Sequence, residues 1–482
     1  MNIITKLMYS LHRILGTLLC ILFLMWFLSA FVMMYHRFPR VSAKEKLQKQ
    51  ELLSTSGDSL PDITSVLSRL PKGEKVRKLT LDRSLGQTIF HIRTNKEIHE
   101  LHLNPSDTLS IIDNERIRQI ATLWSASPIA YIDTLHTLNQ WIPFGELKKE
   151  MPIYKIHFAD DAKTQLYISS QSGEVLQLSN RNERFWAWLG AIPHWVYFLM
   201  VIAGIWVTVD VWHRTRKSHR QGFSPYRKKW YHWHYVSGIF FGIFVLTFTF
   251  SGMMSVADIP EWIHKPALKS SPLRTLQAKA PQPEDYTLDY RTVITSFPDV
   301  RQIEWSNFRK HPYYTVKDGK GEQYIDATDS VPHTLQLQKK EIREGVESIY
   351  DTDSIPAHQR PELHMTLLNH FETYYRDMSS MYRGRSQLPV WKITVDDPDR
   401  SVFYIHPETG IIRYVNTSSR WKYWSYTAMH RMRLPGLNSN TTLRKTVLWI
   451  LLLGGTVTSV TGIVLSINYV RRKCRKKQKR LL

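Results

Sequence analysis

The chain of 482 residues is 43% hydrophobic and carries a formal net charge of +22. So large a positive charge first suggests nucleic acid, but most of the excess charge lies in short segments beside apolar runs. We therefore expect a lipid bilayer, and no nucleic acid, as the partner of these charges.

Four apolar segments are long enough to cross a bilayer, which needs about 20 mostly apolar residues. The first is too long for a signal peptide, and no small-residue cleavage site follows it. The expected order is the N-terminus and first span at 1–36, an outer domain at 37–185, the second span at 186–212, a basic loop at 213–234, the third span at 235–256, a second outer domain with the approach to the last span at 257–445, the fourth span at 446–470 and a basic tail at 471–482.

The basic loop and the C-terminal tail indicate the orientation of these spans. The stretch 213–230 and the tail are rich in arginine and lysine and contain no acidic residue. Because short basic loops stay on the cytoplasmic side, we expect both termini in the cytoplasm. The two long segments between the spans then lie outside.

The chain contains an internal duplication. PIYKIHFADDAKTQLYISSQSG, from Pro152, aligns without a gap with PVWKITVDDPDRSVFYIHPETG, from Pro389, at an offset of 237. Both stretches alternate apolar and polar residues around an Asp-rich corner, which is typical of a β-hairpin. Helix-like segments from Asn114 and Arg291 are expected to complete a small α+β unit in each outer domain.

The spans repeat as well. His12-x-x-x-Gly16 in the first span matches His234-x-x-x-Gly238 in the third, at an offset of 222. Each half therefore reads as span, outer domain, span. Both halves have the same orientation, so we expect a parallel duplication.

Four histidines occupy duplicated places at membrane depth, where ionisable groups are costly and usually mark function. His12 and His234 lie at the cytoplasmic ends of the first and third spans. His194 lies near the outer end of the second span, and His430 is its counterpart on the approach to the fourth. Facing helices that each supply an imidazole suit b-type haem iron. We expect two haems b, near opposite faces of the membrane, with these histidines as axial ligands.

Other readings of these residues remain open. A histidine at the end of a span can simply extend its ring to the headgroups, and His232 is a fallback ligand because it lies two residues from His234. With no C-x-x-C-H motif in the sequence, the haem would be held without covalent attachment. The sequence does not show which histidine pairs with which.

An outer stretch, FETYYRDMSSMYRGRSQLPVW, combines aromatic and basic residues. Such a stretch suits an anionic, partly aromatic ligand held by charge and stacking, although ordinary surface is the simpler interpretation of each residue. The candidate substrate-binding residues are Tyr374, Tyr375, Tyr382, Arg383 and Arg385.

Several motifs in this order resemble the PepSY-associated transmembrane family, in particular its FoxB-type ferrisiderophore reductases. They are LHRILG from Leu11, AIPHWVYF from Ala191, WHYVSGIFFGIFVLTFTFSGMM from Trp233, ETYYRD from Glu372, LPVWKITVDDPDRSVFYIHPETG from Leu388 and RWKYWSYTAMHRMRLP from Arg420. The resemblance implies an integral membrane α-helical protein with four spans and two periplasmic α+β PepSY-like domains.

The resemblance also implies an activity. A protein of this kind is a diheme oxidoreductase of the bacterial inner membrane that reduces Fe(III)-siderophore in the periplasm and releases the iron for iron homeostasis. Because no Gly-rich nucleotide motif follows a strand, the expected electron donor is a quinol or a separate protein. The axial ligands are the only protein groups assigned to the reaction, and no separate catalytic residue is expected.

Two other functions fit parts of the sequence. PepSY-like modules also occur where a propeptide restrains a peptidase, which would make this a non-enzymatic, membrane-tethered interaction protein. A transport component for iron complexes or haem is the other possibility.

Overall fold

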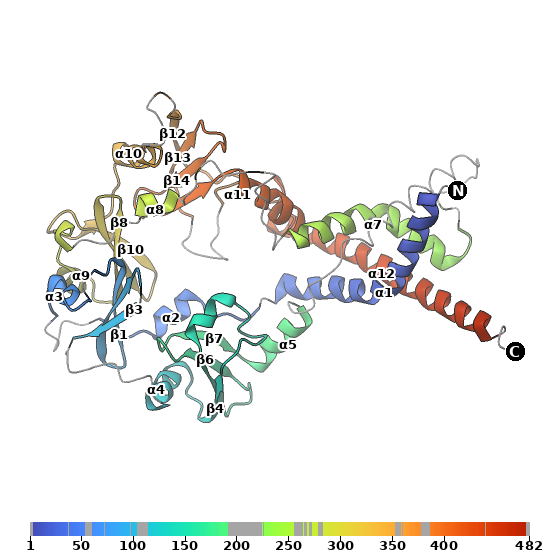
Figure 1. The fold of residues 1–482 in the computed structure, drawn as a ribbon, viewed down its shortest axis with the longest axis horizontal. Helices are drawn as coiled ribbons and strands as arrows, with labels where there is room; N and C mark the ends of the chain where they lie inside the picture. The colour runs from blue at the N-terminus through green and yellow to red at the C-terminus, as the bar shows by residue number, and fades with distance from the viewer. Residues whose placement is uncertain are drawn as a thin grey trace. The chain divides into compact units, whose positions relative to one another are not determined.

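The computed structural model describes two compact units. A helical unit comprises Met1–Pro39, Asn180–Pro260 and Ser419–Leu482, and a sheet unit comprises Arg40–Ser179 and Glu261–Ser418 (Figure 1). The residues left undescribed are 1–2, 37, 54–59, 72, 97, 104–113, 191–223, 225, 255–263, 265–267, 269–271, 278–282, 352–357, 359, 377–385, 439 and 479–482.

Among the described residues of the helical unit, three helices are long and apolar enough to cross a membrane, so the protein is membrane-associated. They are α1 (Ile3–Tyr35), α7 (Lys229–Met253) and α12 (Thr441–Gln478). They contain the first and fourth predicted spans and most of the third. The second predicted span, 186–212, lies largely outside the described residues, and only its beginning is seen, in α5 (Arg181–Gly190).

Two glycines let α12 pack against both other long helices (Figure 1). A Cβ atom on Gly454 would lie 2.2 Å from Cδ1 of Phe241 in α7, and one on Gly455 would lie 2.5 Å from Cζ of Phe27 in α1. Small residues of this kind allow close helix contacts in lipid, where apolar surface alone does not drive association. Phe27 is buried in the aromatic core of the unit together with Phe248 and Leu452.

The sheet unit contains a seven-stranded sheet in the order β11-β10-β9-β8-β1-β2-β3. Its strands are β1 (Val76–Ser84), β2 (Gln87–Thr94), β3 (Ile98–His102), β8 (Val300–Phe308), β9 (His311–Asp318), β10 (Glu322–Asp326) and β11 (His333–Thr334). Segments 37–185 and 257–445 thus both contribute strands to this one sheet.

Two four-stranded sheets complete the unit, each a simple antiparallel succession of neighbouring strands. The first has β4 (Ile129–Leu135), β5 (Ile153–Phe158), β6 (Gln165–Ser169) and β7 (Val175–Ser179), and the second has β12 (Leu363–Leu368), β13 (Val390–Val395), β14 (Val402–Ile405) and β15 (Ile412–Val415). The short helices around the three sheets are α2 (Ala43–Lys49), α3 (Ile63–Leu67), α4 (Asn114–Trp124), η1 (Gly145–Glu150), α8 (Pro272–Gln277), η2 (Pro283–Asp285), α9 (Tyr290–Ser296) and α10 (Lys339–Tyr350).

The predicted hairpin repeat is confirmed. Strands β5, β6 and β7 match β13, β14 and β15 at the offset of 237 residues that the sequence shows. The turns match too, since Lys163 and Arg400 have φ of 47° and 46°, and Gly173 and Gly410 have φ of 65° and 64°. The duplication therefore preserves the backbone at the positions that need a left-handed conformation.

A second repeat joins the two halves. Hairpin β1–β2 matches β8–β9 at an offset of 224 residues, including the left-handed turn residues Leu85 and Arg309. In the antiparallel pairing of β1 with β8, Leu79 faces Trp305 and Leu81 faces Ile303. Because Leu79 is equivalent to Ile303, and Leu81 to Trp305, the two halves meet in a two-fold arrangement like that of a symmetric dimer.

The helix assignment within the second copy differs from the prediction. The segment from Arg291 does form a helix, α9, but Val293 and Ile294 pack on the seven-stranded sheet. The helix that packs against the second four-stranded sheet is α10, through Ile342 and Val346. The prediction was wrong because α9 and α10 both have an apolar face, and the local pattern does not tell which sheet each one covers.

A histidine between two carboxylates links β9, β10 and α10. The ring nitrogens of His311 lie 2.7 Å from Oδ2 of Asp326 and 2.9 Å from Oε1 of Glu341. Burial lowers the pKa of His311, but the hydrogen bonds and charges of the two carboxylates outweigh burial and raise that pKa above the usual 6.5. The cluster therefore stabilises the fold when His311 is protonated.

We predict that His311→Gln destabilises the protein in a pH-dependent way. Since the folded pKa lies above the unfolded one, the stabilisation is fully present below pH 6.5 and is lost as the pH rises through the raised value. The expected loss is on the order of 1 kcal/mol at low pH once solvent screening is allowed for. Thermal unfolding of the full chain at several pH values measures it, with the exposed His364→Gln as the control. A loss that does not change with pH would contradict the prediction.

Candidate functional site

The structure brings together two of the four predicted ligands. The ring centres of His12, on α1, and His234, on α7, are 6.2 Å apart. Two imidazoles that share one iron have ring centres about 6 Å apart, because each metal–nitrogen bond is about 2 Å long. The separation of the two rings therefore suits a shared metal centre.

Both histidines line a cavity of about 400 Å³ between α1, α7 and α12. A Cβ atom built on Gly16, Gly238 or Gly242 would meet no atom within 4 Å, so these positions open into free space. Gly16 and Gly238 each lie one helical turn after a histidine of the pair. Because glycine has no side chain, these positions on both helices leave the space that a flat macrocycle needs beside its ligands.

Helix α12 fixes the orientation of the His234 ring. Its Nδ1 atom lies 3.1 Å from the Thr458 carbonyl oxygen and 3.0 Å from Oγ1 of Thr461. The Thr461 hydroxyl itself donates to the Val457 and Thr458 carbonyl oxygens, so its oxygen is left to accept from Nδ1–H. A histidine that donates through one ring nitrogen presents the other as a metal ligand, and such a partner is typical of metal-bound imidazoles.

The cavity has one cationic residue and a set of phenols among its described lining residues. Arg13 is the cation, and its guanidinium lies 5.1 Å from the ring centre of Tyr469. The described lining contains no acidic residue. This polarity suits a mostly apolar ligand that carries carboxylates at one edge. Residues, spacing and polarity together fit a b-type haem.

His430 occupies a second position in the helical unit. It follows a π-helical segment, η4 (Tyr423–Ala428), an irregularity that is frequent at functional sites. Its ring stacks on Phe248 with 4.1 Å between centres, and its Nδ1 lies 3.2 Å from both the Phe248 carbonyl oxygen and Oγ of Ser251. A Cβ atom on Gly252 would lie 3.3 Å from Cε1 of His430.

This arrangement of His430 repeats that of His234, with Nδ1 engaged and the other ring nitrogen left to bind a metal. Its predicted counterpart in the first half, His194, lies outside the described residues. The structure thus places one histidine of the second pair.

The remaining candidates have different positions. The fallback ligand His232 does not line the cavity, and its ring lies edge-on to Trp233. Tyr375 is buried, stacks on Tyr404 with 5.0 Å between ring centres and donates to the Gln387 carbonyl oxygen, while Tyr374 packs at the edge of the same cluster. The other three candidates of that stretch, Tyr382, Arg383 and Arg385, lie outside the described residues.

Sequence reasoning missed the contribution of α12 to the site. Thr458 and Thr461 hold His234, and a Cβ atom on Gly462 would lie 3.4 Å from Cε1 of the same ring. The stretch GGTVTSVTG, from Gly454, is the signal that could have revealed them, because small and hydroxyl residues stand out in an otherwise apolar span.

Comparison of the chain with family models, with curated proteins and with solved structures finds no match. The fold and site define a membrane-associated protein with three described apolar helices, a histidine-lined cavity between them and separate β-sheet domains. Its function is therefore inferred from the chemistry of the cavity.

Proposed function

We propose that the protein is a diheme b-type reductase of the bacterial inner membrane that passes electrons outward and reduces ferric siderophores in the periplasm. The observation that supports it best is the pair His12 and His234, with ring centres 6.2 Å apart across a glycine-lined cavity between membrane-crossing helices. A bound haem b supplies reversible one-electron transfer.

In this proposal His12 and His234 hold the cytoplasmic haem, and His194 and His430 hold the outer one. The Thr458 carbonyl and the Thr461 hydroxyl engage Nδ1 of His234, so Nε2 is the nitrogen that would bind the metal. Arg13 would attract the carboxylates of a bound haem to one edge of the cavity. The apolar helices would exclude water from the bound group.

The other parts of the chain have matching roles. The second span, 186–212, carries His194, and both termini lie in the cytoplasm because of the basic loop and tail. The sheet unit, proposed to consist of PepSY-like modules, lies in the periplasm and receives the ferric complex. Iron released as Fe(II) is a poorer match for the hard oxygen ligands of the chelate. A quinol or a separate protein donates the electrons.

Proteoliposomes test this function directly. With a quinol trapped inside and a Fe(III)-hydroxamate chelate outside, wild-type protein is expected to produce external Fe(II), detected with a colorimetric Fe(II) chelator. His430→Ala is expected to lower the rate at least tenfold, because it removes a proposed ligand of the outer haem. Protein that contains haem but yields no Fe(II), or vesicles that accumulate the intact Fe(III) complex, would refute the reductase assignment.

A further inference from the structure

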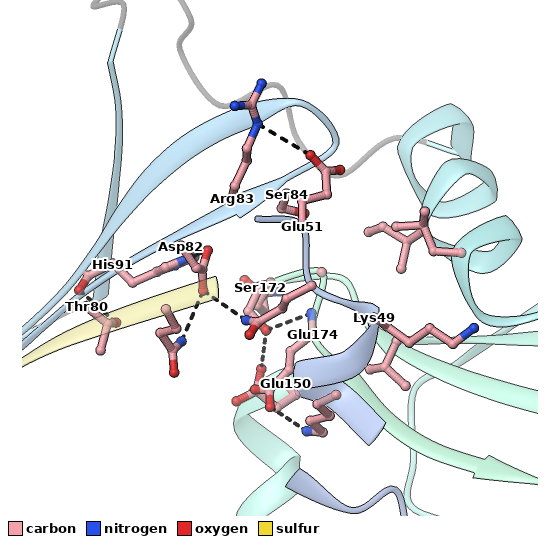
Figure 2. A pocket seen from close by; sticks show the side chains of 18 of the residues that line it. Lys49, Glu51, Thr80, Asp82, Arg83, Ser84, His91, Glu150, Ser172 and Glu174 are labelled. Atoms are coloured by element: carbon pink, nitrogen blue, oxygen red, sulfur yellow. Dashed lines mark hydrogen bonds and ion pairs between the residues drawn. The ribbon is translucent and has the colours of Figure 1, made fainter. Parts of the chain in front are cut away.

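A second cavity, of about 720 Å³, lies within the sheet unit and serves none of the functions described above (Figure 2). One wall is the face of β1, β2 and β8 that carries Thr80, Asp82 and His91. The other wall comes from the end of α2, from α4 and from the turn between β6 and β7, which includes Ser172 and Glu174. A cavity of this size falls in the range of small-molecule sites, about 300–1,000 Å³.

Two cations face each other directly on the sheet wall. Lys78 of β1 is paired with Arg93 of β2 in the antiparallel register, and both side chains line the cavity. Like charges in directly opposed positions destabilise a sheet. Glu304 offsets one of them, since its Oε2 atom lies 2.9 Å from Nζ of Lys78. Arg93 has no ion pair within the described part of the chain.

The second half of the chain provides an internal comparison. At the equivalent positions of β8 and β9, Gln302 is paired with Lys317. The same hairpin therefore forms with a neutral residue in place of Lys78. The fold does not require the pair of like charges in the first half, and a local cost of this kind usually indicates function.

Carboxylates in the cavity are already engaged by neighbouring groups. Asp82 accepts hydrogen bonds from His91, at 3.0 Å, and from the side-chain amides of Gln50 and Gln302, at 3.2 Å. Glu150 accepts from the hydroxyls of Ser169 and Ser172, at 2.8 and 3.2 Å.

The two remaining acids are also paired. Glu174 lies 2.5 Å from Nζ of Lys46, and Glu51 accepts from the Gly86 amide and lies 3.5 Å from Nε of Arg83. Lys49, at the end of α2, also lines the cavity and has no ion pair among the described residues. Lys49 and Arg93 thus leave positive charge on two different walls.

We propose that this cavity binds a polycarboxylate, free or as its metal complex, through Lys49, Lys78 and Arg93. Cations on separate walls suit carboxylates that are spread over one molecule, whereas a single phosphate would bring its charge to one point only. The site goes beyond the proposed function, because it requires neither haem nor electron transfer.

Calorimetric titration of the full chain in detergent with citrate and with Ga(III)–citrate tests the site. Gallium(III) is not reduced under these conditions, so binding is measured independently of any reductase activity. We expect both Lys49→Gln and Arg93→Gln to weaken binding roughly tenfold, the usual effect of losing one charge-assisted contact. Lys44→Gln and Arg77→Gln are the controls: Lys44 is exposed on α2, like Lys49, Arg77 is exposed on β1, which pairs with β2, and neither residue lines the cavity.

Thermal unfolding separates a binding role from a structural one. Arg93→Gln removes the repulsion from Lys78, so the Tm of the ligand-free variant should equal or exceed that of the wild type. The increase in Tm on adding ligand should be smaller for the variant than for the wild type. Tighter binding of Ga(III)–citrate than of citrate assigns the site to the metal complex, and equal binding assigns it to the free acid. No binding of either probe, or equal losses in the two control variants, would overturn the proposal.

Discussion

His234→Ala is expected to lower the haem content of the purified protein from about two to about one per chain. The imidazole is one of two that line the cavity, its ring centre lies 6.2 Å from that of His12, and α12 holds its Nδ1 atom. Without it, the proposed cytoplasmic haem would keep at most one protein ligand. Pyridine haemochrome quantitation relative to protein concentration measures the change.

His232→Ala is the matched control for this substitution. It removes an imidazole two residues away on the same helix that does not line the cavity, and the haem content should stay at about two. His12→Ala should behave like His234→Ala, because both rings are proposed to hold the same haem. If the control loses haem and His234→Ala does not, the ligand assignment is wrong.

Gly238→Leu is expected to abolish the same haem while the protein remains folded. A Cβ atom at Gly238 meets nothing within 4 Å, so the leucine side chain enters the cavity instead of clashing with protein. Replacing glycine within a helix also removes a propensity cost of about 1 kcal/mol. The variant should therefore keep or raise its Tm when both proteins are compared without haem.

Gly455→Leu provides the contrast, because its Cβ would lie 2.5 Å from the Phe27 ring. Overpacking of this kind costs roughly 1–3 kcal/mol or more, so this variant should unfold at lower temperature. Haem absorbance and thermal unfolding in detergent measure both effects. Full haem content in Gly238→Leu, or equal unfolding temperatures of the two variants, would contradict the proposed haem site.

Much of the helical unit could be predicted from local sequence. Apolar runs of sufficient length indicate spans directly, and the repeated His-x-x-x-Gly pattern suggested that His12 and His234 play equivalent roles. That the two rings lie near one another follows only from how α1 and α7 pack on α12. The close contacts at Gly454 and Gly455 determine that packing, and glycine by itself does not reveal its partner helix.

The sheet unit was less predictable, since its second repeat preserves backbone conformation with few identical residues. Leu85 and Arg309 share a left-handed turn, and Leu79 and Ile303 share a buried position, but neither pair consists of identical residues. Alternation of apolar and polar residues predicts a strand but does not show which other strand it pairs with. The pairing of β1 with β8, which unites the two halves in one sheet, therefore became evident only in the structure.

The most direct test of the central claim is the spectrum of the purified wild-type protein. If histidine pairs hold haem b in this chain, the absorbance should show a reducible b-type Soret band, and the oxidised protein should give low-spin electron paramagnetic resonance signals of bis-imidazole iron, with about two haems per chain. A preparation of folded protein that contains no haem, even after haem is supplied, would contradict the account.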